Sequence, residues 1–155
     1  MIIYKTYHST AVVPKGKAGH IEINGILSLS HYDRYVRRKL LHFDNGNMIM
    51  LDLNQPTQLT DGDLLATENG KHFRISAAIE QLSEVKGKNA SHLLELVWHL
   101  GNRHLAIEIF PDCVTVLRNH VSCTMLKGLG ASVRDIDSPF QPLHGAYHDL
   151  SHGSV

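Results

Sequence analysis

Trp98-His99-Leu100-Gly101-Asn102-Arg103-His104 is the stretch that decides how the second half of the chain folds. Its two histidines are separated by about 500° of helical rotation, so they cannot share one face of a helix. The pair Gly101-Asn102 predicts the end of a helix, with Gly101 in the left-handed conformation that glycine adopts readily. We therefore expect His99 on the last helical turn and His104 beyond it, where the next strand begins.

The residues before this stretch repeat with helical spacing. A helix is predicted for residues 90–100, with Asn89 as its N-cap, because apolar side chains recur at i, i+3, i+4 and i+7. The side chains expected to form a buried stripe are Leu93, Leu96, Val97 and Leu100, and Trp98 is expected to be a packing residue. The residues expected on the polar face are His92, Glu95 and His99.

The remainder of the second half alternates between strand and helix patterns. A second helix is predicted after the N-cap Asn119 and ends at Gly130. Strands are predicted at residues 74–82, 105–110, 113–117 and 131–136. The resulting order, β-α-β-β-α-β, is typical of a ferredoxin-like domain, in which an antiparallel sheet carries two helices on one face.

The first half has no helical period and its pattern indicates short strands. Residues 2–7 are rich in strand formers, and Asn45-Gly46 and Asn69-Gly70 each lie between two apolar runs, which predicts two β-hairpins.

The predicted fold class is α+β with two domains. We expect an all-β sandwich or barrel-like domain at residues 1–75, a ferredoxin-like domain at 76–143 and a flexible tail at 144–155.

A basic run stands out in this first half, formed by Arg34, Arg37, Arg38 and Lys39. Positive charge is typical of a solvated edge strand, where it opposes aggregation. The same charges could form a docking patch for an acidic protein partner. The sequence leaves both interpretations open.

Composition excludes several classes of protein. The 155 residues include 15 basic and 15 acidic side chains, so a general nucleic-acid binder is not expected. Neither an apolar run long enough to span a membrane nor a signal-peptide pattern is present, so we expect a cytoplasmic protein. Cys113 and Cys123 are too few for a disulfide scaffold and are expected to be small buried hydrophobes. The twelve histidines are the unusual feature.

Histidine is the commonest metal ligand in proteins, but no compact metal motif occurs in this sequence. His104 alone supplies one nitrogen, whereas a first-row divalent ion requires four to six ligands. In a two-fold homodimer, residues near the axis meet their own copies, so two His104 side chains could share one ion. The C-terminal tail could add the imidazoles of His144, His148 and His152, which recur every four residues.

The word His-Leu-Gly-Asn-Arg-His at residues 99–104 resembles the signature of the UreE urease accessory proteins, which are nickel metallochaperones. Two later segments, residues 119–131 and 140–148, resemble the second helix and the closing segment of that family's metal domain. The sequence departs from the family pattern at Glu108, Asn119 and Leu143, where glutamine, aspartate and glutamate are usual.

The resemblance implies a cytoplasmic homodimer that carries Ni(II), with His104 as the ligand at the dimer axis, and in which two dimers could join through metal. It implies delivery to the complex of apo-urease with an accessory GTPase. Nitrogen ligands bind copper more strongly than nickel, so Cu(II) and Zn(II) are expected to compete in vitro. The contributions of His99, His120 and the two cysteines stay open.

Two other functions fit some of these residues. A metal-dependent hydrolase would need an acid or base near the metal, and Glu95 and Asp112 are the residues that suggest one. A peptide-binding adaptor would use the β domain to add an extended segment to a sheet edge, without metal transfer. We expect a carrier, not an enzyme, because a partly open site between subunits can release its ion.

Overall fold

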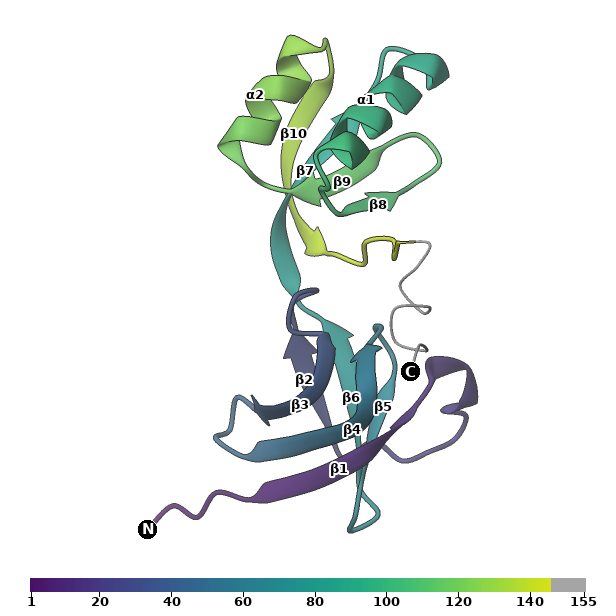
Figure 1. Ribbon diagram of the computed structural model, residues 1–155. Coiled ribbons are helices and arrows are strands. Elements are labelled where there is room, and N and C mark those ends of the chain that lie inside the picture. The colour runs from purple at the N-terminus through teal and green to yellow at the C-terminus, as the bar shows by residue number, and fades with distance from the viewer. Residues whose placement is uncertain (146–155) are drawn as a thin grey trace. The chain divides into compact units, whose positions relative to one another are not determined.

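The computed structural model describes residues 1–145, and the chain divides into two compact units between Ala77 and Ala78 (Figure 1). The first unit is all-β, and the second combines four strands with two helices. This arrangement confirms the predicted two-domain α+β fold class. No helix within residues 1–145 has the length and apolar character needed to cross a membrane.

The first unit is one curled sheet of six strands in the order β2-β6-β5-β1-β4-β3. The pairs β1–β4 and β2–β6 are parallel and the other neighbours are antiparallel. A core of aliphatic side chains and Phe73 fills the inside of the curl. The strands are β1 (Thr6–Val13), β2 (Gly25–Leu29), β3 (Tyr35–His42), β4 (Met48–Gln58), β5 (Leu64–Thr67) and β6 (His72–Ala77), with a 3-10 turn, η1 (Lys15–Lys17), after β1.

Both predicted hairpins are confirmed. Strands β3 and β4 pair antiparallel around Asn45-Gly46, and β5 and β6 pair antiparallel around Asn69-Gly70. Gly46 and Gly70 have φ values of +89° and +80°, which residues with a side chain rarely adopt. The local turn chemistry was therefore sufficient to predict these connections.

Two strand predictions were wrong in their bounds. The predicted strand at residues 2–7 begins only at Thr6. Thr6 pairs with Met48, which is the first residue of β4, so residues 2–5 lie before the paired part of this strand. The single strand predicted at 74–82 is two strands, β6 and β7 (Ile79–Lys86), which belong to different sheets.

The four residues of the basic run differ in burial: Arg34 is buried and the other three are exposed. Strand β3 is an edge strand, as one interpretation expected, and its Arg38 and Lys39 pair with Asp52 and Asp33 at 3.0 and 2.9 Å. The hydrogen bond from Lys39 lowers the pKa of the Asp33 carboxyl. Arg34 was wrongly placed with these exposed charges, because it is only 1% exposed and donates from Nη1 to the Leu29 carbonyl at 2.8 Å.

The second unit is a four-stranded antiparallel sheet in the order β10-β7-β9-β8, with both helices on one face (Figure 1). This is the predicted ferredoxin-like arrangement. Its core joins β7 and β9 to the apolar stripes of the two helices, with Leu96, Leu100 and Leu126 almost completely buried. The remaining elements are α1 (Ala90–Asn102), β8 (Ile107–Ile109), β9 (Val114–Leu117), α2 (His120–Gly128) and β10 (Ser132–Pro139).

Replacing Arg34 with alanine is expected to destabilise the protein by about 2 kcal/mol, because the change opens a cavity and removes the donor to the buried Leu29 carbonyl. Arg37→Ala, three residues along the chain at an exposed position, is the matched control and should change stability by less than about 0.5 kcal/mol. Urea denaturation measures both. Equal effects of the two substitutions would contradict the structural role of Arg34.

Candidate metal centre

His104 directly follows the C-cap of α1. The helix continues through Gly101 to Asn102, and Arg103 is its C-cap. His104 then has a φ of +58°, and among residues 1–145 it is the one non-glycine residue with a positive φ. The predicted left-handed residue, Gly101, was therefore wrong by three positions, and the left-handed conformation belongs to the candidate ligand itself.

Two backbone hydrogen bonds hold this helix end. The N–H of His104 donates to the Gly101 carbonyl at 3.0 Å, and the N–H of Leu105 donates to the Leu100 carbonyl at 3.1 Å. This pair of bonds is the Schellman motif, which satisfies carbonyls that the last helical turn would leave without a partner. Leu100 and Leu105 also pack in the same core cluster, which is the apolar contact that accompanies this motif.

Helix α2 ends in the same way but with a glycine. The N–H of Gly130 donates to the Lys127 carbonyl at 3.0 Å, and the N–H of Ala131 donates to the Leu126 carbonyl at 3.0 Å. Gly130 has a φ of +85°, so it occupies the position that His104 occupies in α1. Glycine is the usual residue here, and a residue with a Cβ is strained by about 1 kcal/mol.

The imidazole of His104 is available for a ligand. The side chain is exposed and has no hydrogen-bond partner in the described part of the chain. Its two neighbours in the chain, Arg103 and Leu105, line a pocket of about 410 Å³ together with Val116 of β9 and Val121 and Met125 of α2, whereas His104 itself does not line it. Within the described residues, the helix end therefore offers one imidazole without an internal partner.

The other histidines of α1 are less available. The Nδ1 of His92 accepts from the Lys88 N–H at 2.9 Å and its Nε2 donates to the Leu129 carbonyl at 2.8 Å, so both ring nitrogens are used. This histidine was expected on a polar face, and it instead ties the start of α1 to the end of α2. His99 is half-buried, with its ring 5.0 Å from that of Trp98.

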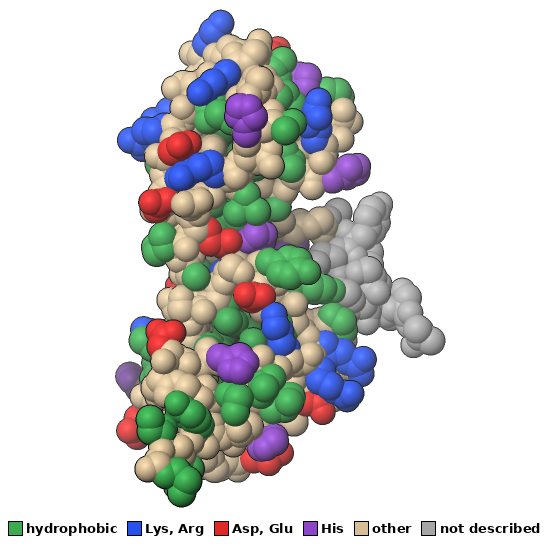
Figure 2. Space-filling view, turned by 90° about the vertical axis from the view of Figure 1, so that its left-hand side faces the viewer, with side chains coloured by type: hydrophobic (Ala, Val, Ile, Leu, Met, Phe, Trp, Pro, Cys, Tyr) green, Lys and Arg blue, Asp and Glu red, His purple; other side chains and the backbone are tan. Residues whose placement is uncertain are grey.

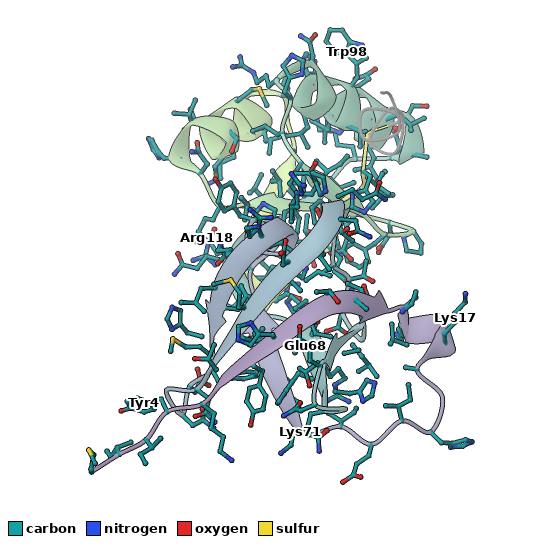
Figure 3. The ribbon with its side chains drawn as sticks, turned by 60° about the horizontal axis from the view of Figure 1, so that its bottom comes forward. Tyr4, Lys17, Glu68, Lys71, Trp98 and Arg118 are labelled. Carbon is teal, nitrogen blue, oxygen red and sulfur yellow. The ribbon has the colours of Figure 1, made fainter. Side chains whose placement is uncertain are left out.

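Trp98 was expected to be a packing residue, but it is 62% exposed and stands at the outer surface of α1 (Figure 3). His120 is also exposed, at the first position of α2 after the cap Asn119.

Cys113 is buried as predicted, whereas Cys123 is only partly buried. Burial raises the pKa of the Cys113 thiol, and the nearby Glu84 carboxylate raises it further. The metal-binding thiolate is therefore disfavoured at Cys113.

No group of three or more histidine, cysteine or acidic side chains that could hold a metal ion occurs among residues 1–145. On the face drawn in Figure 2, the histidine side chains stand apart from one another. Of the hydrolase candidates, Glu95 lies on the exposed surface of α1, and Asp112 lies 4.0 Å from the ammonium of Lys86. The described residues thus bring one free imidazole, and not a complete ligand set, to the end of α1.

The segment just before the tail is attached to β8. The N–H of Leu143 donates to the Ile107 carbonyl at 2.9 Å, and the N–H of Gln141 donates to the Glu108 carboxylate at 2.8 Å. His144, the next residue, is exposed. The other two predicted tail ligands, His148 and His152, lie outside the described residues.

Two sequence models of a known family match this chain in succession. The N-terminal domain of the UreE urease accessory protein matches residues 14–78, and the C-terminal domain of the same protein matches residues 80–155. The chain belongs to the UreE urease accessory protein family.

Curated members of the UreE family are similar over most of the chain. The urease accessory protein UreE of Agrobacterium fabrum is 48% identical over 153 residues, which cover 99% of this chain and 90% of that protein. The UreE protein of Rhizobium meliloti is 46% identical over 147 residues, or 95% of each chain. The UreE protein of Rhizobium leguminosarum bv. trifolii is 54% identical over 128 residues, which cover 83% of this chain and 65% of that longer protein.

In this UreE-family chain, His104→Gly is expected to raise stability by about 1 kcal/mol, because glycine relieves the strain of the left-handed conformation. Gly130→Ala is the mirror-image control and should lower stability by a similar amount. The Cβ of an alanine at position 130 would come within 3.2 Å of the flexible end of Lys88 and would make an ordinary contact, at 3.7 Å, with the His92 ring. Both changes are measured by thermal and urea denaturation of the metal-free protein. A destabilised His104→Gly protein would contradict the assigned strain.

Proposed function

We propose that this protein is a homodimeric, cytoplasmic nickel carrier for urease maturation. One Ni(II) ion is held between the His104 side chains of two subunits that meet at a two-fold axis. The carrier passes its cargo to apo-urease through the complex that apo-urease forms with an accessory GTPase. Membership of the UreE family supports the maturation role, and the free imidazole of His104 supports the metal site.

The isolation of His104 is the observation that carries this proposal. Within residues 1–145 its imidazole is exposed and has no hydrogen-bond partner, and these residues supply no cluster of further ligands. A divalent first-row ion bound by one nitrogen exchanges rapidly with water, so tight binding requires donors from elsewhere. A two-fold axis through the site supplies a second, identical nitrogen without any further residue type.

A site of this kind is suited to transfer and not to turnover. Ligands of a receiving protein can occupy the coordination positions that the carrier leaves open before the ion dissociates from the carrier. A hydrolase needs an open position together with an acid or base fixed beside it. The candidates for that role, Glu95 and Asp112, are an exposed helix residue and a partner of Lys86.

Nitrogen ligands alone do not select nickel. Copper binds imidazole more strongly than nickel in the Irving–Williams order, and zinc also binds it. We therefore assign nickel from the family and expect Cu(II) and Zn(II) to displace it in vitro. Because imidazole must be neutral to bind a metal, acidification should weaken binding of all three ions.

The tail and the first unit complete the proposal. His144, His148 and His152 add weaker ligands that raise the local concentration of imidazole, and two dimers can join through metal. We assign residues 76–143 to metal binding and residues 144–155, of which 146–155 lie outside the described part of the chain, to a histidine-containing tail. We assign residues 1–75 to contacts with partner proteins or extended peptides. The edge strands β2 and β3 each leave one side of their backbone open to an added strand.

His104→Ala is expected to abolish tight nickel binding, which in the unchanged protein should amount to about one ion per dimer. Isothermal titration calorimetry with Ni(II), combined with light scattering, reports the affinity, the stoichiometry and the assembly state. His42→Ala, at an exposed histidine of β3 in the first unit, is the matched control and should bind as before. His104→Gly should lose nickel too, although its helix end is relieved of strain. Full-affinity binding by either His104 variant would refute the site.

Removing residues 144–155 is expected to leave the tight site in place and to lower the number of weaker nickel ions bound. The truncated chain keeps Leu143 and its bond to β8, so the fold of the second unit should not change. Equilibrium dialysis at increasing Ni(II) separates the two classes of site. Replacing His144, His148 and His152 together with serine in the full-length chain is the control for the length of the tail. Complete loss of the tight site in both proteins would show that the tail supplies an essential ligand.

A further inference from the structure

The residues at the end of α1 fix the backbone conformation of His104. They hold His104 in a left-handed conformation, with a φ of +58°, by two backbone hydrogen bonds and by the packing of the buried Leu100 and the partly buried Leu105 in one core cluster. A helix end without such a motif frays, and its last residues sample several conformations. The motif therefore fixes the backbone from which the His104 side chain departs.

We propose that Leu100 and Leu105 are positioning residues for the His104 imidazole. This inference rests on the proposed role of His104 as a metal ligand. Leu100 is 0% exposed and its carbonyl accepts from the Leu105 N–H, so this hydrogen bond closes the turn that contains His104. Neither residue has a donor atom in its side chain, and both act on the metal only through His104.

The physical reason is the geometry that a shared ion demands. Metal–nitrogen bonds of about 2 Å tolerate errors of only a few tenths of an ångström and about 10–20° before affinity falls. Two imidazoles from two subunits must converge on one ion, so an uncertainty in one backbone is doubled by symmetry. A His104 backbone that is already fixed loses less conformational freedom when the ion arrives.

The comparison with α2 supports a selected position. The same motif at the end of α2 contains Gly130, which adopts the left-handed conformation without strain. We call the two residues joined by the outer hydrogen bond of the motif its clasp; in α2 the clasp is Leu126 and Ala131, and in α1 it is Leu100 and Leu105. In α1 a larger apolar residue, Leu105, stands where α2 has Ala131. The bulkier clasp and the strained histidine occur together at the helix end that bears the candidate ligand, and not at the other.

The test compares two leucines of one core. Leu105→Ala loosens the packing of Leu105 on Leu100, and Leu93→Ala makes the same chemical change in the same cluster, about 14 Å along α1 from its last residue, Asn102. Nickel titration of the intact full-length protein should show roughly tenfold weaker binding for Leu105→Ala and unchanged affinity for Leu93→Ala. Leu105→Ile, which keeps an apolar clasp, should restore most of the affinity.

Two further measurements separate positioning from general destabilisation. Amide hydrogen exchange should show faster exchange at Leu105 in Leu105→Ala but not in Leu93→Ala, while urea denaturation shows comparable losses of stability. If Leu105→Ala does not fold, Leu105→Val provides a milder change at the same position, with the same expected order of affinities.

Unchanged nickel affinity in Leu105→Ala, or in Leu105→Val where that is the protein studied, would overturn the positioning role. So would an equal loss of affinity in Leu93→Ala. Neither result affects the proposed function, which stands or falls separately on the His104 variants. If His104→Gly retains full nickel affinity, the metal site itself is wrong and the positioning role falls with it.

Discussion

The packing of the buried Leu100 and the partly buried Leu105 in the core of the second unit decides where α1 ends. Because Leu105 must return to this core, the chain reverses at His104, and the reversal requires a left-handed residue. The candidate ligand is thereby exposed at a fixed place between a helix and strand β8. In the proposed metal site, the position of the ligand depends on this apolar packing, although no atom of the two leucine side chains can bind a metal.

The same packing explains why the left-handed residue was predicted three positions too early. Glycine is the preferred left-handed residue, so Gly101 was the natural choice from local sequence. A motif centred on Gly101 would pair Val97 with Asn102, which is polar and would not pack in the core. A motif centred on His104 pairs Leu100 with Leu105, and both are apolar. The energy of burying a leucine exceeds the cost of a strained histidine, so tertiary packing overrode local preference.

Features governed by a few neighbouring residues were predicted well. The Asn-Gly turns gave both hairpins, and Asn89 and Asn119 cap their helices with side-chain hydrogen bonds. The buried stripe of α1 followed from its spacing. Features that depend on distant partners were not predicted. Nothing in the pattern of residues 74–82 marks the passage from one sheet to another, and nothing local distinguishes buried Arg34 from the exposed basic residues after it.

The candidate site shows the same division. The word His-Leu-Gly-Asn-Arg-His singled out His104, but only the structure shows that its imidazole is free and its backbone strained. A histidine within a helix has neighbours three and four residues away that can complete a metal site. A histidine just beyond a helix end lacks the neighbours on its C-terminal side, and residues 1–145 place no group of metal ligands around His104. For the proposed carrier, metal affinity then becomes a property of the dimer, and by linkage each ion that binds two chains also holds those chains together.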